Sequence, residues 1–120
     1  MRKENNIILE KSMEFAVRVV KLYKYLFKQK GESVMSKQLL RSATSVGANI
    51  REAEYAQSRN DFVSKMSISL KETSETEYWL ELLYRTEYLT EQEYKSIAND
   101  CGEIARILTA IVHNSKKAAH

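Results

Sequence analysis

Metal and redox chemistry has little support among the residues of this 120-residue chain. The chain holds one cysteine, Cys101, and two histidines, His113 and His120, which are too few and too far apart to build a zinc site. The Glu-x-x-His pairs with which helical bundles hold two iron ions do not occur in it. We therefore expect no metal ion and no other cofactor.

Nucleophilic and acid–base catalysis are equally unsupported. The serines and threonine of segment 42–45 have no neighbouring base to activate a hydroxyl, and no glycine-rich phosphate loop precedes a predicted helix. The glutamates of segment 72–77 suit a solvated or interface helix face better than a Mg²⁺ site. Cys101 falls among apolar residues at helical spacing, which is typical of a packed, inert thiol. We interpret the chain as a non-enzyme.

Basic residues at helical spacing form the one pattern with a positive chemical meaning. Lysine and arginine bind phosphates without reading sequence, and a tyrosine among them can stack on a base. On one face of the first predicted helix, the nucleic-acid-binding candidates are Lys11, Arg18, Lys21, Tyr25 and Lys28. The pattern predicts weak, salt-sensitive binding of RNA or DNA without sequence specificity.

Charge is segregated along the chain, although the formal net charge is only +3. Residues 1–41 hold ten Lys and Arg against four Glu, whereas residues 42–103 hold six Lys and Arg against twelve Asp and Glu. Three interpretations stay open. The basic region is a surface for nucleic acid, or it meets the acidic region of another subunit, or both are solvated helix faces.

Membrane and export signals are lacking in the sequence. No uncharged run approaches the ~18 residues of a membrane span, and residues 1–6 hold no apolar stretch of a signal peptide. A single cysteine suits a reducing compartment. We expect a cytoplasmic protein with no membrane partner.

Four long helices are predicted from apolar periodicity, end signals and a composition with no proline and three glycines. The first spans residues 6–30 and ends at Gly31, and the second follows Ser36 as N-cap and ends near Ala56. The third spans residues 61–87 with Asn60 as its cap. The fourth begins at the capping box of residues 90–93.

Short loops between these segments make neighbouring helices antiparallel. The predicted fold is therefore all-α, an antiparallel up-down-up-down four-helix bundle. It forms a single domain over residues 1–120, with an ordered core of about 6–115 and a frayed tail from Asn114. Gly47 lies in the middle of the second predicted helix, where glycine lowers helix stability by about 1 kcal/mol relative to alanine. We therefore expect the backbone of another segment to lie close to Gly47.

One carboxylate falls on the predicted core stripe of the third helix. Glu77 shares that stripe with Phe62, Met66, Leu70, Thr73, Leu80 and Tyr84. Because a buried carboxylate needs a partner, we expect Glu77 to contact Arg41 or Asn49.

Apolar residues outside the main stripes predict a homo-oligomer, because monomers rarely expose a large apolar patch. The interface candidates are Met13, Val17, Val20, Phe27, Ile68, Trp79 and Leu82.

Residues 36–53 read S-K-Q-L-L-R-S-A-T-S-V-G-A-N-I-R-E-A, and this block resembles the signature of the small bacterial 23S rRNA intervening-sequence proteins. A second block is similar over Ser58, Arg59, Asp61 and Phe62 and again from Leu70 to Leu80. The likeness covers about residues 8–112.

The resemblance implies an antiparallel four-helix bundle that assembles as a homopentamer. It extends to the accessory variability protein of diversity-generating retroelements, which implies a basic surface that binds nucleic acid or a protein partner. It implies no catalytic residue. The residues that match the family's polar positions are Arg41, Asn49, Glu75 and Glu77, which are candidates for a structural polar network.

Two function hypotheses follow. The first is an oligomeric protein that binds nucleic acid, RNA in particular. The second is a protein-interaction scaffold with no nucleic-acid role. A basic stripe that stays open to solvent favours the first, and one consumed in subunit contacts favours the second.

Overall fold

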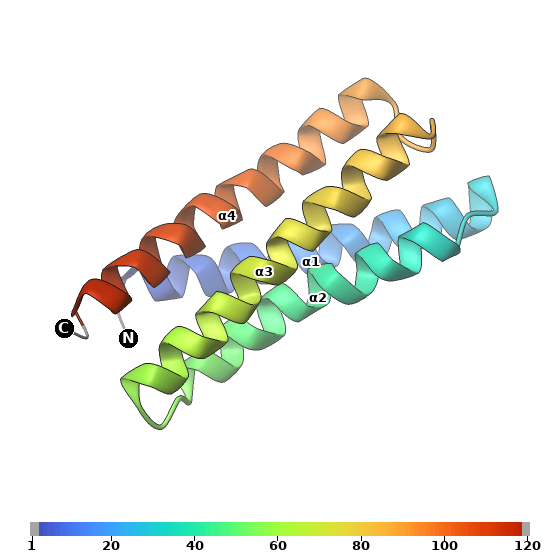
Figure 1. The fold of residues 1–120 in the computed structure, drawn as a ribbon. Helices are drawn as coiled ribbons and strands as arrows, with labels where there is room; N and C mark the ends of the chain where they lie inside the picture. Colours follow the sequence, from blue (N-terminus) through green and yellow to red (C-terminus); the bar gives the residue numbers. More distant parts are fainter. Residues whose placement is uncertain (1–2, 119–120) are drawn as a thin grey trace.

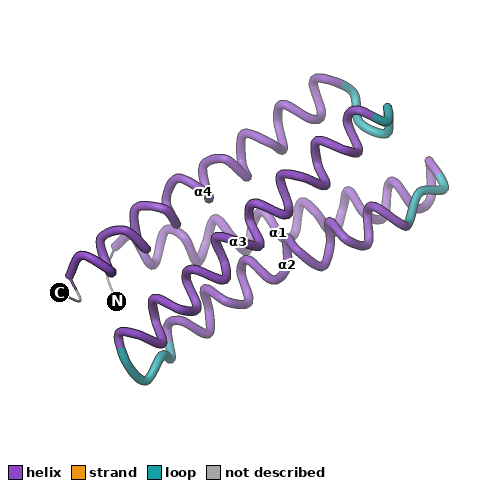
Figure 2. Tube along the Cα trace, viewed as in Figure 1, coloured by secondary structure: helices purple, strands orange, loops and turns teal. Residues whose placement is uncertain are grey.

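Four helices make up the protein in a computed structural model that describes residues 3–118, with side chains from 6 to 117. They are α1 (Lys3–Lys30), α2 (Val34–Glu54), α3 (Arg59–Arg85) and α4 (Glu91–Ala118), and no strand occurs within the described range. The helices run side by side and alternate in direction, joined by short loops (Figures 1 and 2). The predicted all-α four-helix bundle is confirmed.

Each helix packs on its two neighbours in the bundle and not on the helix diagonally opposite. The contact between α2 and α3 is the most extensive, and the contact between α1 and α4 is the sparsest. The α1–α2 and α3–α4 loops lie at one end of the bundle, and the start of α1 and the end of α4 lie at the other (Figure 1). The seam between α1 and α4 is thus the most open of the four.

The inward face of α3 differs from the predicted one. Its buried residues are Met66, Ser69, Thr73, Thr76, Leu80 and Leu83. Glu77 is exposed, so the prediction of a buried carboxylate is wrong. The predicted core residues Phe62, Leu70 and Tyr84 are only half-buried. The helix is rotated so that small hydroxyl residues, rather than a charge, face the interior.

Hydroxyl groups can lie in this core because each finds a partner there. Ser69 Oγ donates to the Val46 carbonyl of α2 at 2.8 Å, and Thr76 Oγ1 lies 2.9 Å from Ser42 Oγ, also on α2. Every buried side-chain nitrogen and oxygen of the described residues has a hydrogen-bond partner. Each buried polar group therefore replaces its lost contacts with water by a hydrogen bond within the protein.

Helix ends confirm two of the four predicted signals. Gly31 has a φ of +65°, the left-handed conformation expected after α1. In the capping box before α4, Thr90 Oγ1 accepts from Glu93 N–H at 3.1 Å, and Glu93 Oε1 accepts from Thr90 N–H at 2.8 Å. Helix α4 continues as a helix to Ala118, so the predicted frayed tail from Asn114 is wrong as far as the described residues extend.

The other two predicted caps are wrong. Before α2, the buried carboxylate of Glu32 accepts the N–H groups of Val34, Met35 and Ser36 at 2.8–3.0 Å, and Ser36 lies inside the first turn. Before α3 the N-cap is Ser58, whose side chain accepts from Asp61 N–H, and not Asn60. Before α2, the longer side chain of Glu32 reaches the free N–H groups, and before α3, Ser58 lies at the position from which its hydroxyl accepts the Asp61 N–H.

Close approach of α1 and α2 explains the glycine in the middle of α2. A Cβ atom at Gly47 would lie 3.4 Å from Ser12 Oγ and 3.7 Å from the Ser12 carbonyl oxygen of α1. The expectation that Gly47 lies against another backbone is confirmed.

Candidate nucleic-acid interface

The outer surface of α1 divides into two halves. Its apolar half, with Met13 and Ala16, lines a shallow groove shared with Thr44 and Ala48 of α2. Its basic half lines hollows shared with α4, in which Lys11 and Arg18 lie beside Asp100, Glu103 and Ile97. One helix thus presents two chemically different faces on either side of its exposed edge.

Two of the five predicted nucleic-acid-binding residues are engaged within the subunit. Lys11 Nζ lies 2.6 Å from Glu103 Oε1, and Arg18 donates to Asp100 Oδ2 at 2.7 Å and to Ser96 Oγ at 2.8 Å. The hydrogen bond and charge of Glu103 raise the pKa of Lys11. Part of the match between the basic and acidic regions is therefore made inside one chain, across the sparse α1–α4 seam.

The other three candidates, Lys21, Tyr25 and Lys28, are exposed. Among the residues that the structure describes, neither lysine has a carboxylate within ion-pair distance. Lys24 and Lys30, which the sequence analysis did not single out, are exposed and unpaired in the same sense. The signal that finds them is simple: segment 20–30 holds four lysines and no Asp or Glu.

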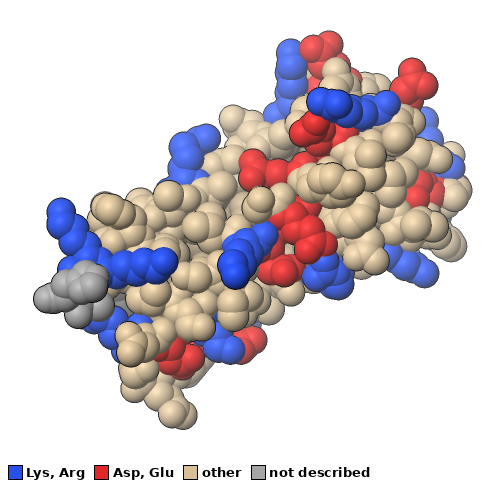
Figure 3. Space-filling model, in the orientation of Figure 1, with Lys and Arg blue, Asp and Glu red and all other residues tan. Residues whose placement is uncertain are grey.

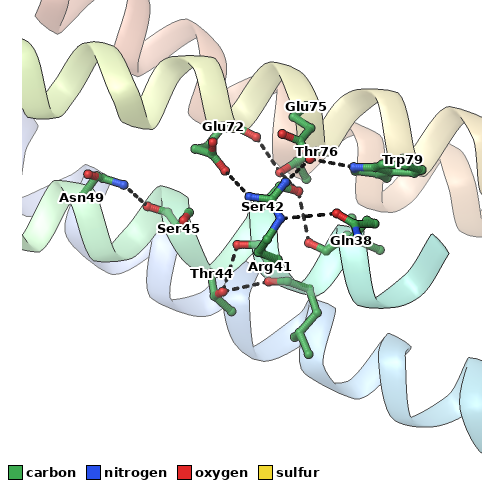
Figure 4. A network of polar contacts seen from close by, with 12 residues as sticks. Gln38, Arg41, Ser42, Thr44, Ser45, Asn49, Glu72, Glu75, Thr76 and Trp79 are labelled. Carbon is green, nitrogen blue, oxygen red and sulfur yellow. Dashed lines mark hydrogen bonds and ion pairs between the residues drawn. The ribbon is translucent and has the colours of Figure 1, made fainter. Parts of the chain in front are cut away.

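A polar cluster joins α2 and α3 on the outside of their seam (Figure 4). Arg41 forms ion pairs with Glu72, at 3.2 Å, and with Glu75, and Trp79 Nε1 donates to Glu75 Oε2 at 2.9 Å. The hydrogen bonds from Trp79 and Arg41 lower the pKa of Glu75. The cluster ties an arginine, two carboxylates and an indole into one charged contact between helices.

Two of the four predicted network residues lie outside this cluster. Asn49 Nδ2 donates to the Ser45 carbonyl within its own helix at 2.9 Å, away from Glu75 (Figure 4). Glu77 contacts neither Arg41 nor Asn49, because it lies on the exposed side of α3. Arg41, one of the two partners predicted for Glu77, instead contacts Glu72 and Glu75, which lie five and two residues earlier in α3.

Acidic side chains gather over the middle of α3 and at the end of the bundle where α3 meets α4 (Figure 3). The exposed lysines of α1 lie on a different helix, but Lys30 lines the same hollow as Glu87 and Glu93, so charges of both signs meet at this end of the bundle.

Four of the predicted interface residues, Met13, Val17, Phe27 and Ile68, have 40–55% of their surface exposed. The remaining three, Val20, Trp79 and Leu82, are half-buried. Exposed apolar and aromatic residues that the sequence analysis did not include are Ile7, Val34, Tyr55 and Tyr78. A single subunit therefore leaves substantial apolar surface in contact with water.

Cys101 is buried, as predicted, and its Sγ faces the Thr73 carbonyl at 3.8 Å. Burial, with the charges of Glu77 and Asp100, raises the pKa of this thiol to about 12. A thiol in this state is a poor nucleophile. Within residues 3–118, no group of His, Cys, Asp and Glu is placed to hold a metal ion, and no helix is long and apolar enough to span a bilayer.

Comparison with known proteins settles the family. The family model of the 23S rRNA-intervening sequence protein matches residues 4–110, which take in α1, α2, α3 and most of α4. The chain belongs to this family. The resemblance expected from residues 36–53 is thereby confirmed.

A solved relative supports the same assignment for this intervening-sequence family member. It is the 1.70 Å crystal structure of a protein with unknown function from the S23 ribosomal protein family of Bacteroides thetaiotaomicron VPI-5482. The two chains are 60% identical and superpose with a TM-score of 0.91, over 92% of this chain and 98% of that one. No match is found among curated proteins.

Proposed function

We propose that this protein is a non-enzymatic oligomer that binds nucleic acid, RNA in particular, weakly and without sequence specificity. The observation that carries the proposal is segment 20–30 of α1, with four exposed lysines, no acidic residue and the exposed ring of Tyr25 among them. Lysines on a helix surface contact phosphates as point charges. Such contacts provide affinity and little discrimination between sequences.

Oligomerisation multiplies this small number of charges. Four lysines in one subunit bind a nucleic acid weakly, but several copies held together act on the same strand with a high effective concentration. The exposed apolar residues Met13, Val17, Phe27 and Ile68 support assembly with further copies of the chain. The expected state is a homopentamer, a number that rests on the family resemblance.

A protein-interaction scaffold without a nucleic-acid role is the second candidate. Two observations favour it. Lys11 and Arg18 are neutralised by α4 of the same subunit, which shortens the open part of the basic stripe. The exposed apolar surface also offers an area on which another protein can bind.

The test is a charge reversal restricted to unpaired lysines. The variant Lys21→Glu/Lys28→Glu changes the basic face and spares Arg18, whose contact with Asp100 helps to hold α1 against α4. The matched control is Lys37→Glu/Lys71→Glu, which makes the same charge change at exposed lysines of α2 and α3. The probe is an RNA hairpin with single-stranded tails, in a mobility-shift assay at low salt.

We expect wild type and control to retard the RNA and the α1 variant to lose retardation. Affinity should fall steeply from low to physiological salt, because each neutralised phosphate releases counterions. No retardation by wild type at tens of micromolar protein would contradict nucleic-acid binding and favour the scaffold. Equal loss in the control would show that net charge, not the α1 surface, is responsible.

A further inference from the structure

A trough lined by tyrosines lies between the second half of α1, the start of α4 and the α3–α4 loop. It consists of two hollows of about 380 and 340 Å³ that share Tyr25, Leu89 and Glu93. The rest of its lining comes from Lys30, Tyr84, Glu87, Tyr88 and Thr90 in one hollow and from Arg18, Lys21, Leu22 and Ile97 in the other. It follows the sparsely packed α1–α4 seam and opens beside the exposed lysines of α1.

The aromatic wall of the trough is held in place. Tyr84 stacks on Tyr94 with ring centroids 4.5 Å apart and planes 4° from parallel, which joins α3 to α4. Tyr88 is half-buried, whereas Tyr25 is 41% exposed on the opposite side of the trough. The site thus pairs a supported aromatic wall with one ring that is open to an incoming planar group.

Charges around the trough are mixed in sign, and each has a defined position. Lys21 and Lys30 have no ion-pair partner within the described chain, whereas Arg18 is held by Asp100. Glu93 uses Oε1 to accept from the Thr90 N–H, which fixes the carboxylate and leaves Oε2 without a partner among the described residues. Glu87 lies in the loop at a φ of 71°. Cations therefore flank the trough, and a positioned carboxylate lies within it.

We propose that this trough takes an unpaired nucleobase of a single-stranded nucleic acid, stacked on Tyr25. The adjoining phosphates contact Lys21, which lines the trough, and Lys28, which follows Tyr25 by three residues on α1. Stacking on an exposed aromatic ring is how proteins bind single strands with little sequence preference. The carboxylate of Glu93 accepts from an exocyclic amino group, the contact that acidic residues make with cytosine N4. The assignment rests on the nucleic-acid binding proposed above and narrows it to unpaired bases.

Two other occupants fit the trough less well. A duplex cannot offer a base to Tyr25, because its bases are stacked and paired inside the helix. An organic or side-chain cation would suit tyrosines and carboxylates, but it would also meet the ammonium groups of Lys21 and Lys30, unpaired within the described chain, which line the same hollows. None of the residues in the predicted oligomer interface lines it, so assembly through that interface does not require the trough to close.

The test compares labelled 12-nucleotide oligo(C), oligo(U) and a 12-base-pair RNA duplex by fluorescence anisotropy at low salt. We expect both single strands to bind more tightly than the duplex, and oligo(C) several-fold more tightly than oligo(U). The variant Tyr25→Ala should weaken oligo(C) binding about tenfold or more, whereas Tyr25→Phe keeps the ring and should retain most of it. Glu93→Gln preserves the capping box and should abolish the preference for oligo(C).

Each failure has its own meaning. Duplex binding equal to that of the single strands, unaffected by Tyr25→Ala but lost in Lys21→Glu/Lys28→Glu, would overturn the base-binding trough and leave phosphate binding intact. Equal affinities for oligo(C) and oligo(U) would overturn the contact with Glu93. No binding of any probe would overturn the nucleic-acid function itself.

Discussion

Thr76 Oγ1 of α3 lies 2.9 Å from Ser42 Oγ of α2, in a position where both residues are fully buried. Ser42 also donates to the Leu39 carbonyl at 3.2 Å, and Thr76 Oγ1 lies 2.8 Å from the Glu72 carbonyl. Each hydroxyl therefore contacts a carbonyl of its own helix, and the two hydroxyls also contact each other between α2 and α3. Small side chains at this contact let α2 and α3 approach closely, consistent with their being the most extensively packed pair.

Removal of one hydroxyl from this pair should destabilise the fold. Thr76→Val and Ser42→Ala are each expected to lower the free energy of unfolding by about 1 kcal/mol, because a buried polar partner is left with fewer hydrogen bonds. The double variant should cost less than the two single costs together. Urea denaturation of all four proteins measures this coupling, and strict additivity would mean that the contact contributes nothing.

Glu32 should behave as a pH-dependent helix cap. Glu32→Ala is expected to cost about 1–2 kcal/mol at pH 7, in the range of strong N-caps, since three N–H groups of α2 lose their acceptor. Burial raises the pKa of Glu32, but the backbone N–H bonds of Met35, Ser36 and Val34 outweigh it and leave the pKa below its usual 4.5.

The sign of the pH effect follows from that lowered pKa. The carboxylate contributes its stability above the unfolded-state pKa and loses it as the pH falls through the folded-state value. Unfolding curves of wild type and Glu32→Gln should therefore differ at pH 7 and converge as the pH is lowered below 4.5. A difference that is constant with pH would show that the charge is not involved.

Truncation of buried side chains in α3 and α4 should lower the free energy of unfolding substantially. Leu80→Ala and Ile104→Ala are each expected to cost about 2–5 kcal/mol, because both side chains are buried and leave cavities. Val34→Ala serves as control and should be near neutral, since Val34 is 77% exposed. Thermal and urea unfolding followed by circular dichroism measure all three, and costs near zero at both core sites would contradict the packing described.

Glu77 and Glu75 should respond differently to the same substitution. Glu77→Gln is expected to change stability by less than about 0.5 kcal/mol, as exposed positions do. Glu75→Gln removes the charge that faces Arg41 and should cost about 0.5–1 kcal/mol, while Trp79 keeps an oxygen to which it can donate. A larger loss at Glu77 than at Glu75 in urea titrations would restore the buried carboxylate that periodicity predicted.

The apolar half of α1 should hold subunits together. Light scattering of wild type at micromolar concentration is expected to give an assembly of several subunits, a pentamer by family resemblance. Met13→Asp/Val17→Asp should reduce its mass, because a charge at each position would be desolvated in the interface. Val34→Asp, at an exposed site outside the predicted interface, should leave it unchanged. A wild-type monomer would contradict the assembly and its interface together.

Local signals in the sequence determined the helices and several of their ends. The Gly31 terminator and the Thr90–Glu93 box could be predicted because their partners lie within a few residues along the chain. The existence of four amphipathic helices followed from composition and period, since a chain with this pattern must bury its apolar faces, although the face that α3 buries differs from the predicted one. Residues 36–53 identified the family for a different reason, because their sequence resembles that of its members.

Only the tertiary structure decided how α3 is rotated and which charges meet. Ser69 and Thr76 face inward because Val46 and Ser42 of α2 offer hydrogen-bond partners there, and a period count that ranks hydroxyls as polar cannot include such partners. The contact of Arg18 with Asp100 joins residues 82 positions apart, and it appears only when α1 lies against α4. Sequence spacing fixes which residues share a helix face, but packing chooses the opposing face and thereby which charges are paired and which stay open to a ligand.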